Sequence, residues 1–530
     1  MLKKRRKIFN YILSTLFFSI ITGLLAGTVI VIFKAAAAFV IDLSGKSYAL
    51  ARENPLLIFI GIGILAVIAL GYTLLYRVFP NAKGGGIPNS VGILRGILPI
   101  DWFKTTVTVF FASLVTFFTG VPLGTEGPSV QIGTAIGKGV SLAGGKKRTA
   151  LDRYIMTGGA SAGFTVATGS PIAGLVFALE EAHQSISPLI MIAGAAAVVA
   201  AKAASNFLSP IFGVSPVLFH HIELIPVTPK DFWMPVVISL AVGFISVAFL
   251  KYYTVLHDFW KKIFSKSPVY VKILSVLVIT FALGLVSSTF ISTGHSLTDI
   301  LLHPATPIYM IVLALIIRSS LMIIASSSGI TGGMFLPIMA LGALVASLLG
   351  NIFILLGMDA SYYPFLVMLG ITAAVSGMMK MPLTASVFAI EALSLSGHIL
   401  SVLITTTLAF LVVDIFGSNS ITESVLENRI HSMHKRKKPQ VYEAFVTVCD
   451  GTFAVGKQAR DVLWPSNMII LSVKHSDEKR ANATELGEKI LFADDVLHIR
   501  LSTYNINETY RELSSLIGEQ KLDFAEQKEI

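Results

Sequence analysis

An acidic residue, Glu126, stands inside the motif Gly124-Thr125-Glu126-Gly127-Pro128, which interrupts a strongly apolar part of the chain. A proline in the first turn of a helix leaves the neighbouring backbone N–H groups without acceptors, and the helix dipole adds positive charge at the same end. Such a helix end binds anions. We therefore expect Glu126 to lie at the mouth of an anion site, which its carboxylate can fill and from which another anion can displace it once it is protonated.

A glycine run closed by a proline occurs twice more, in Gly84–Pro88 and in Gly332–Pro337. A second acid, Glu181, ends the apolar segment Pro171–Glu181, which is too short to cross a bilayer. Apolar segments of about ten residues are usually half-helices or re-entrant pieces. The sequence thus predicts broken helices whose glycine-rich N-termini meet, and a substrate that is an anion.

The composition indicates a polytopic membrane protein. Of the 530 residues, 54% are hydrophobic and only 14% are charged, and the mean hydropathy is +0.75. A soluble globular protein of this length does not need so apolar a sequence. The single cysteine, Cys449, excludes a disulfide framework and thiolate metal clusters. We expect no metal site and no cofactor.

The formal charge of +10 comes from basic clusters that flank apolar segments, so we do not expect a nucleic-acid partner. These clusters are Lys3–Lys7, Lys146–Arg148 and Lys435–Lys438. By the positive-inside rule they place both ends of the membrane domain, and the segment that follows it, in the cytoplasm. The expected location is the plasma membrane, which the chain would cross many times.

The apolar part contains an internal repeat. Pro171–Glu180 matches Pro382–Glu391 at a shift of 211 positions, with the proline, Val-Phe-Ala and the glutamate identical. Three residues around the Glu126 motif recur at a shift of 209 positions: Gly124, Pro128 and Gly133 return as Gly333, Pro337 and Gly342. Two halves with short, broken segments at corresponding places are typical of transporters that bind their substrate near the bilayer midplane.

Together these motifs resemble those of the CLC family of chloride channels and chloride/proton exchangers, over about Ile8–Ile430. The family's G-S-G-I-P appears as Gly84–Pro88, its G-K/R-E-G-P as Gly124–Pro128 and its G-x-F-x-P as Gly333–Pro337. Any one motif is weak, whereas three in order beside a repeat are specific. The resemblance implies a polytopic α-helical fold with two inverted repeats, and a homodimer with one anion pathway in each subunit.

The resemblance also implies which residues form the pathway. Glu126 would be the external gate, and Glu181 the internal acid that transfers protons. The anion would lie against the three glycine loops and the backbone amides of Met334 and Phe335. The implied anion-binding residues are Gly85, Gly86, Ile87, Gly124, Gly127, Met334, Phe335 and Thr422.

Three positions depart from the family pattern. The serine whose hydroxyl contacts the central anion is Gly85 here, and the tyrosine that supplies a second hydroxyl aligns with Thr422. A lost hydroxyl removes a charge-assisted hydrogen bond worth about 1.5–3 kcal/mol, so affinity or selectivity can differ from that of a typical chloride exchanger. Thr125 replaces a basic residue, which reduces the positive potential near the pathway.

The repeat separates two neighbouring acids. Glu180 has a counterpart in Glu391, whereas Glu181 corresponds to Ala392. We therefore interpret Glu180 as a structural feature of both halves and Glu181 as the functional acid. A solvated end of the half-helix would also explain two adjacent glutamates.

Other polar groups are less informative. We interpret His220-His221 as a solvated turn rather than a metal site, because adjacent histidines do not easily face one ion. Ser326–Ser328 would line the approach to the anion loop, although small residues also serve helix packing. No nucleophile and base stand at a catalytic spacing, so we do not expect an enzyme.

The composition changes at about Pro439, which divides the chain into a membrane domain at 1–432, a cytoplasmic α+β domain at 440–520 and a disordered tail at 521–530. Alternating apolar runs predict the elements of the second domain. The expected strands are Tyr442–Val448, Met468–Val473, Lys489–Phe492 and Val496–Leu501, and the expected helices are Val455–Leu463 and Asn505–Ile517. This domain resembles the C-terminal subdomain of regulators of potassium conductance, the TrkA-C type.

The second resemblance implies a regulatory ligand. Some bacterial domains of this type bind cyclic di-AMP between two copies, and here Asn467, Lys474, His475 and Arg480 would form the contact set. A purely structural clamp between two such domains is an equal alternative.

The sequence therefore predicts transmembrane chloride transport by chloride/proton antiport with a glutamate gate, in a homodimer surrounded by membrane lipid. A passive chloride channel regulated by voltage or a ligand shares every pore motif. A fluoride/proton exporter is compatible with the changes at Gly85 and Thr422.

Overall fold

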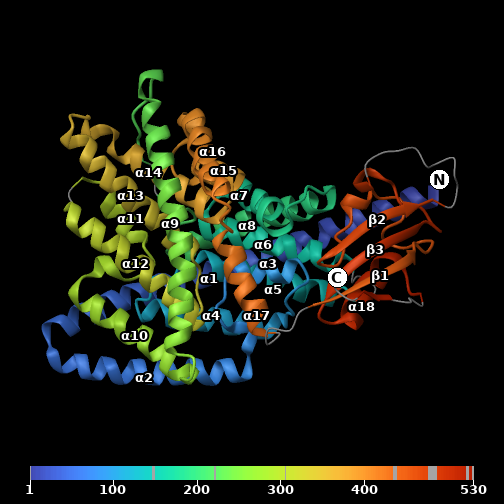
Figure 1. Cartoon of the computed structure of the whole chain (residues 1–530), viewed down its shortest axis with the longest axis horizontal. Helices are drawn as coiled ribbons and strands as arrows, with labels where there is room; N and C mark the ends of the chain where they lie inside the picture. Colours follow the sequence, from blue (N-terminus) through green and yellow to red (C-terminus); the bar gives the residue numbers. More distant parts are fainter. Residues whose placement is uncertain are drawn as a thin grey trace.

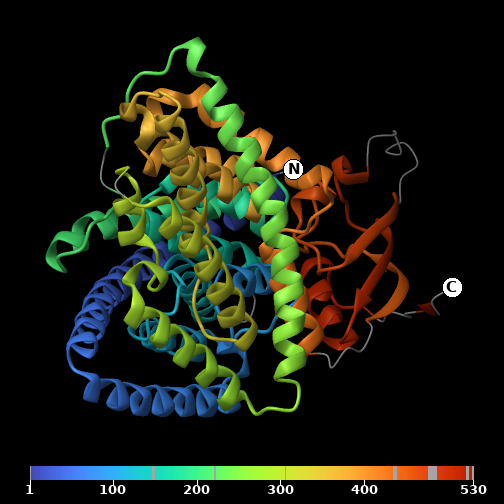
Figure 2. The same ribbon diagram turned by 60° about the vertical axis from the view of Figure 1, so that its left-hand side comes forward.

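The computed structural model describes residues 2–145, 150–219, 222–304, 306–433, 439–475, 486–520 and 525–527. Figure 1 shows a large helical body and, at one end, a small domain built on a β-sheet. Turning the molecule leaves the sheet domain at the side of the helical body (Figure 2). Four groups discussed above lie outside the described residues: His220-His221, Arg480 and the basic clusters Lys146–Arg148 and Lys435–Lys438.

The first half of the helical body alternates long helices with short ones. Its elements are α1 (Leu2–Glu53), α2 (Pro55–Val78), α3 (Ile87–Leu94), α4 (Trp102–Phe118), α5 (Glu126–Ala143), α6 (Asp152–Thr168), α7 (Pro171–Phe177), the π-helix η3 (Ala178–His183) and α8 (Pro188–Ile211). Local sequence sets several starts: the Asn54 side chain accepts from Leu56 N before α2, and Asp101 accepts from Lys104 N before α4. The predicted half-helix Pro171–Glu181 is α7 continued by η3.

The second half repeats this plan. Its helices are α9 (Trp233–Ile263), α10 (Val269–Val286), α11 (His295–Leu301), α12 (Ile308–Ser328), α13 (Phe335–Leu355), α14 (Tyr363–Met379), α15 (Pro382–Ala392), α16 (Ile399–Ile415) and α17 (Ile421–Met433). Matching glycines bring matching helices into contact. A Cβ on Gly133 would clash with the backbone of Gly159, and one on Gly342 would clash with the backbone of Gly370. The sequence repeat is therefore also a repeat of close helix packing, α5 on α6 and α13 on α14.

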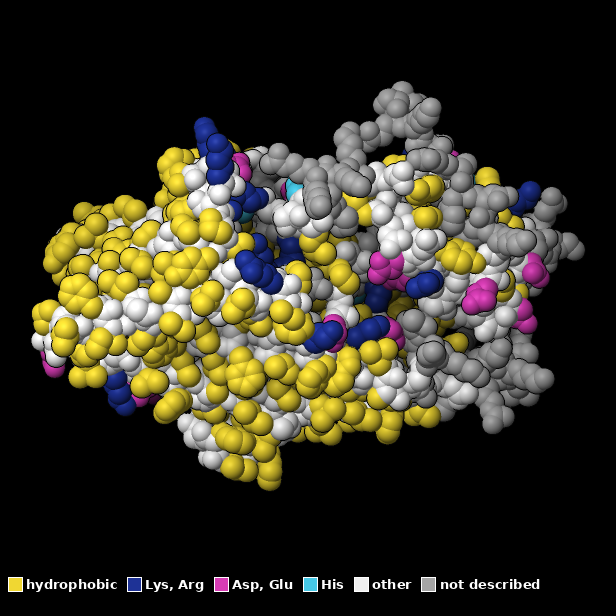
Figure 3. Space-filling view, turned by 90° about the horizontal axis from the view of Figure 1, so that it is seen from below, with side chains coloured by type: hydrophobic (Ala, Val, Ile, Leu, Met, Phe, Trp, Pro, Cys, Tyr) yellow, Lys and Arg dark blue, Asp and Glu magenta, His cyan; other side chains and the backbone are white. Residues whose placement is uncertain are grey.

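The outside of the helical body is suited to lipid. Within the described residues, nine helices are long and apolar enough to cross a membrane. Figure 3 shows hydrophobic side chains over most of this surface, and Lys and Arg gathered between it and the sheet domain. The helical body is thus the membrane domain of a multi-pass protein, and the basic side chains mark its edge towards the sheet domain.

The C-terminal domain is an antiparallel sheet with one helix. Its strands are β1 (Gln440–Thr447), β2 (Met468–Lys474), β3 (Val496–Thr503) and β4 (Ala525–Gln527), in the order β2-β3-β1-β4, and its helix is α18 (Ile506–Ile517). Alternate residues of β1 and β3, such as Ala444, Val446, Leu497 and Ile499, face a core that Leu513 of α18 completes. The expected disordered tail does not hold for residues 525–527, which pair with β1.

Two expected elements of this domain are wrong. Val455–Leu463 contains only the short 3-10 helix Ala459–Asp461, and Lys489–Phe492 makes one isolated bridge instead of a strand. The two segments bond to each other: Gly456 N donates to Leu491 O at 2.7 Å, and Ala459 N donates to Lys489 O at 2.9 Å. Backbone groups used in this pairing are not available for the helical turns that the apolar spacing suggested.

The C-terminal domain packs on the start of α6 and on the first turns of α1. The Tyr154 hydroxyl donates to Asp461 O at 3.0 Å and accepts from Leu463 N at 3.1 Å. Phe453 packs edge to face with Tyr11, with ring centroids 5.2 Å apart. The sheet domain is therefore attached to the membrane domain by buried aromatic and polar contacts as well as by the chain.

Candidate anion-binding site

Three glycine-rich loops meet inside the membrane domain. A Cβ on Gly127 would lie 2.6 Å from the Cα of Gly333 and 3.0 Å from the Cα of Gly86, so only glycine allows this approach. Gly124 and Gly333 also form an antiparallel bridge, with N···O distances of 2.7 and 2.9 Å. The structure thus brings together the three loops that the sequence singled out, although the third lies more than 200 residues after the other two along the chain.

The meeting point collects the N-termini of α3, α5 and α13. These helices begin at Ile87, Glu126 and Phe335, directly after the glycine loops, and Met334 is the N-cap of α13. First-turn N–H groups have no intrahelical acceptor, and each helix end carries positive partial charge. Three such ends lie together here, and the predicted residues Gly86 and Gly127 stand at their meeting point.

Glu126 is fully buried as the first residue of α5. One carboxylate oxygen, Oε1, accepts from the Thr125 hydroxyl at 3.1 Å, while Oε2 has no hydrogen-bond partner among the described residues. Oε2 lies 2.6 Å from the position of a Cβ on Gly124, so the carboxyl group folds back over that glycine. A buried, half-satisfied carboxylate is costly, and the arrangement suits a group that leaves the site or takes up a proton.

Other side chains fill the place of the missing serine. Gly85 has φ +38°, and a Cβ there would lie 2.8 Å from Thr331 Cγ2 and 3.3 Å from Gln131 Oε1. Gln131 accepts from Gly86 N at 2.7 Å, and the Thr331 hydroxyl donates to Ala82 O at 2.9 Å. The sequence reasoning missed Gln131 and Thr331. A polar side chain inside the apolar segment that forms α5 was a sequence signal for Gln131. The sequence contains no comparable signal for Thr331.

Two half-buried lysines stand on the Glu126 side of the molecule. Lys34 Nζ donates to Val166 O and Ser215 O, both at 3.1 Å, and Lys202 Nζ donates to Gly169 O at 2.9 Å. Both cations thus satisfy carbonyl groups at the C-terminus of α6, the negative end of that helix. Lys34 and His295 also act electrostatically on Glu126. Positive charge near Glu126 therefore comes from other elements, although position 125 is threonine. The sequence signal that was overlooked is a lysine within an apolar segment.

Glu181 is buried in η3, on the side of the C-terminal domain. Arg95 holds this segment, since its guanidinium donates to Glu181 O at 2.9 Å and to Ala182 O at 3.1 Å and pairs with Glu423 at 2.6 Å. Thr422 lies beside the Glu181 carboxyl group, and its hydroxyl has no hydrogen bond of normal length among the described residues. The structure therefore places Thr422 next to the second acid, and it is not among the groups nearest Gly85.

The serines in the last turn of α12 are engaged elsewhere. Ser327 Oγ is 2.7 Å from His257 Nδ1, and Ser328 Oγ accepts from Trp260 Nε1 at 2.9 Å. These contacts tie α12 to α9. Two of the three serines thus serve helix packing. This is the alternative role that the sequence left open beside lining the approach to the anion loop.

The expected contact set for cyclic di-AMP does not form one cluster. Asn467 precedes β2, whereas Lys474 and His475 stand at its other end, roughly 23 Å away at about 3.3 Å per residue. His475 is buried against Asp495, with 3.0 Å between Nδ1 and Oδ2. The prediction that these residues surround one strand end is therefore wrong, because a seven-residue strand separates them and one side chain faces the core.

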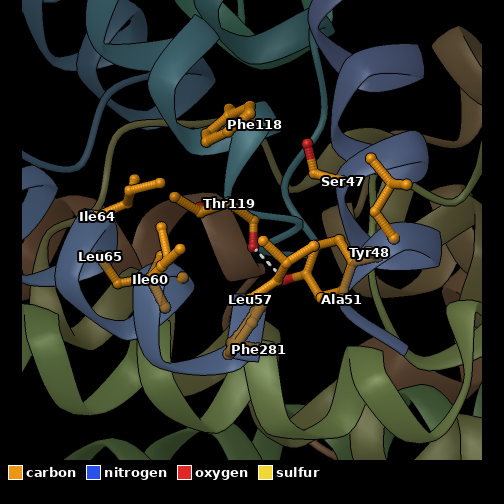
Figure 4. Close-up of a pocket in the computed structure, with 12 residues that line it drawn as sticks. Ser47, Tyr48, Ala51, Leu57, Ile60, Ile64, Leu65, Phe118, Thr119 and Phe281 are labelled. Atoms are coloured by element: carbon orange, nitrogen blue, oxygen red, sulfur yellow. Dashed lines mark hydrogen bonds between the residues drawn. The ribbon is translucent and has the colours of Figure 1, made fainter. Parts of the chain in front are cut away.

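A separate apolar cavity of about 220 Å³ lies between α1, α2 and α10 (Figure 4). Ile60, Ile64 and Phe281 contribute to its wall, and the Tyr48 hydroxyl at its edge donates to Thr119 O at 2.8 Å. Among the residues that the structure describes, no charged side chain lines it. It is therefore not part of the anion site.

Comparisons with known proteins agree with this architecture. Residues 68–414 match the family model described as voltage gated chloride channel. The H(+)/Cl(-) exchange transporter ClcA of Vibrio vulnificus is 26% identical over 432 residues, which cover 80% of this chain and 92% of the relative.

Solved structures share the fold. A slow cyanobacterial Cl-/H+ antiporter has a TM-score of 0.70 at 22% identity, covering 78% of this chain and 98% of its own. A CLC-type fluoride/proton antiporter has a TM-score of 0.61 at 19% identity, covering 76% and 96%. The family model spans more than half of the sequence, and the chain therefore belongs to the voltage-gated chloride channel (CLC) family.

Proposed function

We propose that this protein exchanges chloride for protons across a membrane. The observation that carries the proposal is the meeting of three helix N-termini at a buried, half-satisfied glutamate. Positive helix ends favour an anion, and a carboxylate on the same spot competes with it. The name of the Vibrio vulnificus relative, an H(+)/Cl(-) exchange transporter, supports the same reading.

In this mechanism Glu126 is the gate. While ionised, its carboxylate occupies the anion position; once protonated, it no longer competes as a charge, and chloride takes its place against the backbone amides. Glu181 passes the proton between Glu126 and the side of the C-terminal domain. Opposite movements of chloride and protons then share one obligatory step, the protonation of Glu126.

A fluoride/proton exporter is the second candidate. Gly85 leaves the central site without the serine hydroxyl, and a CLC-type fluoride/proton antiporter is among the proteins of similar fold. A passive chloride channel would use the same loops, but it gives no role to the buried Glu181.

Reconstitution into liposomes with simultaneous anion and pH recording tests these alternatives. An exchanger moves protons uphill when a chloride gradient drives it, and nitrate should substitute in part. Chloride flux without proton movement would identify a channel instead. Proton movement driven by fluoride and not by chloride would identify the exporter.

The assembly and orientation belong to the same proposal. We propose a homodimer in the plasma membrane, with both ends of the membrane domain and the C-terminal domain in the cytoplasm, as the basic clusters favour. Exposed apolar side chains on α8 and α16, such as Phe207 and Leu403, give a surface that a second copy can cover. Crosslinking between these helices in membranes would test the dimer.

A ligand of the C-terminal domain, with cyclic di-AMP as the first candidate, rests on the TrkA-C resemblance. Asn467, just before β2, and Lys474, at the end of β2, are the described residues of the expected set that are exposed. Calorimetry on the purified full-length protein with added cyclic di-AMP tests this proposal. If no heat of binding is measured at cyclic di-AMP concentrations well above micromolar, the C-terminal domains act only as a structural clamp between two subunits.

A further inference from the structure

A second polar cavity, of about 480 Å³, lies where α2, α10 and α17 come together. It is open at the surface and separate from the glycine loops. Three basic side chains and several hydroxyl groups line it: Arg77, Lys83, Arg429, Thr73, Tyr76 and Ser432. The remaining wall is apolar and includes Leu70, Val269 and Met433. The cavity thus has a cationic end and an apolar end.

The cationic end is a concentration of like charge. Lys272, Arg429 and Lys261 are the charged groups that act on Lys83, and all three are basic. Among the described residues, no aspartate or glutamate lines the cavity. Gathering so many cations is unfavourable unless an anion shares the space. A phosphate group satisfies both guanidinium and ammonium donors.

The apolar end faces the part of the surface that is suited to lipid. On α2, Leu74 is 51% exposed and Val78 is 66% exposed, and both lie within the last turns of that helix, next to Arg77. Leu70, a wall residue of the cavity, is 50% exposed. A ligand in the cavity can therefore keep its polar head on Arg77 and Lys83 while an acyl chain runs along α2.

Backbone contacts connect the cavity to the anion loop. Arg429 Nη1 donates to Lys83 O, and the Tyr76 hydroxyl donates to Gly329 O at 2.6 Å. Gly84 N, at the start of the glycine loop, donates to the same carbonyl of Gly329 at 2.9 Å. A group bound in the cavity would thus touch residues that fix the first loop of the anion site.

We propose that this cavity binds the phosphate headgroup of an anionic phospholipid. Free phosphate would satisfy the basic end, but only a lipid also uses the apolar wall and the exposed face of α2. The inference rests on the membrane placement of the chain and is independent of proton coupling.

Native mass spectrometry of the full-length protein in detergent tests the site. We titrate phosphatidylglycerol and phosphatidylcholine with identical acyl chains, and expect the first to bind more tightly. At about 1 kcal/mol for each basic residue, Arg77→Gln should weaken phosphatidylglycerol binding roughly 5-fold and Arg77→Gln/Lys83→Gln roughly 30-fold. The matched control, Lys262→Gln/Lys266→Gln, removes the same charge from exposed residues near the C-terminal end of α9 and should bind as the wild type does.

Three results would overturn the proposal. Equal binding of the two lipids would show that the headgroup charge is not recognised. Equal losses in the test and control pairs would indicate attraction to net charge alone. Displacement of the lipid by millimolar inorganic phosphate would identify a phosphate site instead. Since the readout is binding, failure here leaves the antiport proposal untouched, and failure of antiport leaves this one untouched.

Discussion

Glu180 and Glu391 cap each other's half-helices. Glu180 follows α7 and binds the start of α15, while Glu391, near the end of α15, binds the start of α7. Each carboxylate accepts two backbone N–H groups at 2.6 to 3.0 Å: those of Leu383 and Thr384 for Glu180, and those of Ile172 and Ala173 for Glu391. These acids therefore lock the two halves together, and Glu181, which has no repeat counterpart, is left for another task.

The mutual capping predicts that removing either carboxylate, Glu180 or Glu391, lowers the stability of the protein by a similar amount. Glu180→Ala or Glu391→Ala leaves two first-turn amides unpaired, so each should lower the free energy of unfolding by about 1–3 kcal/mol. Thermal melting in detergent would measure this. Glu223→Ala, at an exposed loop acid, is the matched control and should melt as the wild type does. Melting of the Glu180 variant at the control temperature would refute the structural role.

Glu126→Gln should separate anion movement from proton movement. A neutral amide cannot compete as a charge for the helix ends, nor can it carry the proton, while its volume leaves the packing around Gly124 intact. Liposomes with this variant should conduct chloride without any proton signal. Proton uptake driven by a chloride gradient in this variant would remove Glu126 from the coupling step.

Glu181→Ala should suppress proton flux while chloride flux persists. Among the described residues, no backbone N–H of a helix start donates to the carboxyl group of Glu181, whereas two donate to that of Glu180. The melting temperature should therefore change by less than in Glu180→Ala. The comparison of the two neighbouring variants separates a transport role from a structural one. Intact coupling in Glu181→Ala would point to a water path instead.

The central features of the site were predictable because they are local. A glycine run closed by a proline specifies a helix N-terminus in any fold, and the repeat indicated that three such ends belong together. The capping pair was also foreseen in part, since Glu180 and Glu391 occupy the same place in both halves. A structural feature that depends only on the backbone of a short motif, such as a helix start, could therefore be predicted from the sequence.

The missed features depend on contacts between distant segments. Nothing near Thr331 indicates that its methyl group fills the space beside Gly85, because Gly85 lies some 250 residues earlier in the chain. In the C-terminal domain, Val455–Leu463 has a helical spacing of apolar residues, but its backbone pairs with the segment around Lys489. Tertiary pairing thus overrode a local pattern, and the burial of His475 against Asp495 is the same effect.

Gly85→Ser should not restore the family's site by itself. The left-handed φ of +38° and the 2.8 Å approach of Thr331 Cγ2 both oppose a side chain, so we expect a loss of about 1–3 kcal/mol in stability. Thr331→Ser removes the methyl group and keeps the hydroxyl that bonds Ala82 O. The double variant should regain the part of the stability that the Thr331 contact costs, while the backbone strain at position 85 stays. It should bind chloride about 10-fold more tightly than the wild type, measured by calorimetry. If Gly85→Ser alone bound chloride tightly and melted normally, Thr331 would not be the obstacle.

Arg153 connects the C-terminal domain to the Glu181 segment, and this contact should respond to pH. Its guanidinium donates to Leu94 O at 2.7 Å, to Trp464 O at 2.7 Å and to Glu512 at 3.0 Å. Leu94 precedes Arg95, the residue that holds the Glu181 backbone. Arg153→Ala should therefore weaken the docking of the C-terminal domain on the membrane domain. The amide hydrogens of α18 should then exchange faster than in the wild type.

Burial raises the pKa of Glu512 above its ordinary value of 4.5, although Arg153 acts in the opposite direction. Because the pKa of Glu512 is higher in the docked form, the docked form binds more protons than the free domain. The Glu512 carboxyl group therefore favours docking most below pH 4.5. This contribution is lost as the pH rises through the pKa that Glu512 has in the docked form. Glu512→Gln should remove this pH dependence and keep α18 protected at neutral pH, because the backbone acceptors of Arg153 remain. Faster exchange in Glu512→Gln than in the wild type at pH 7 would mean that the ion pair outweighs the burial of the carboxylate.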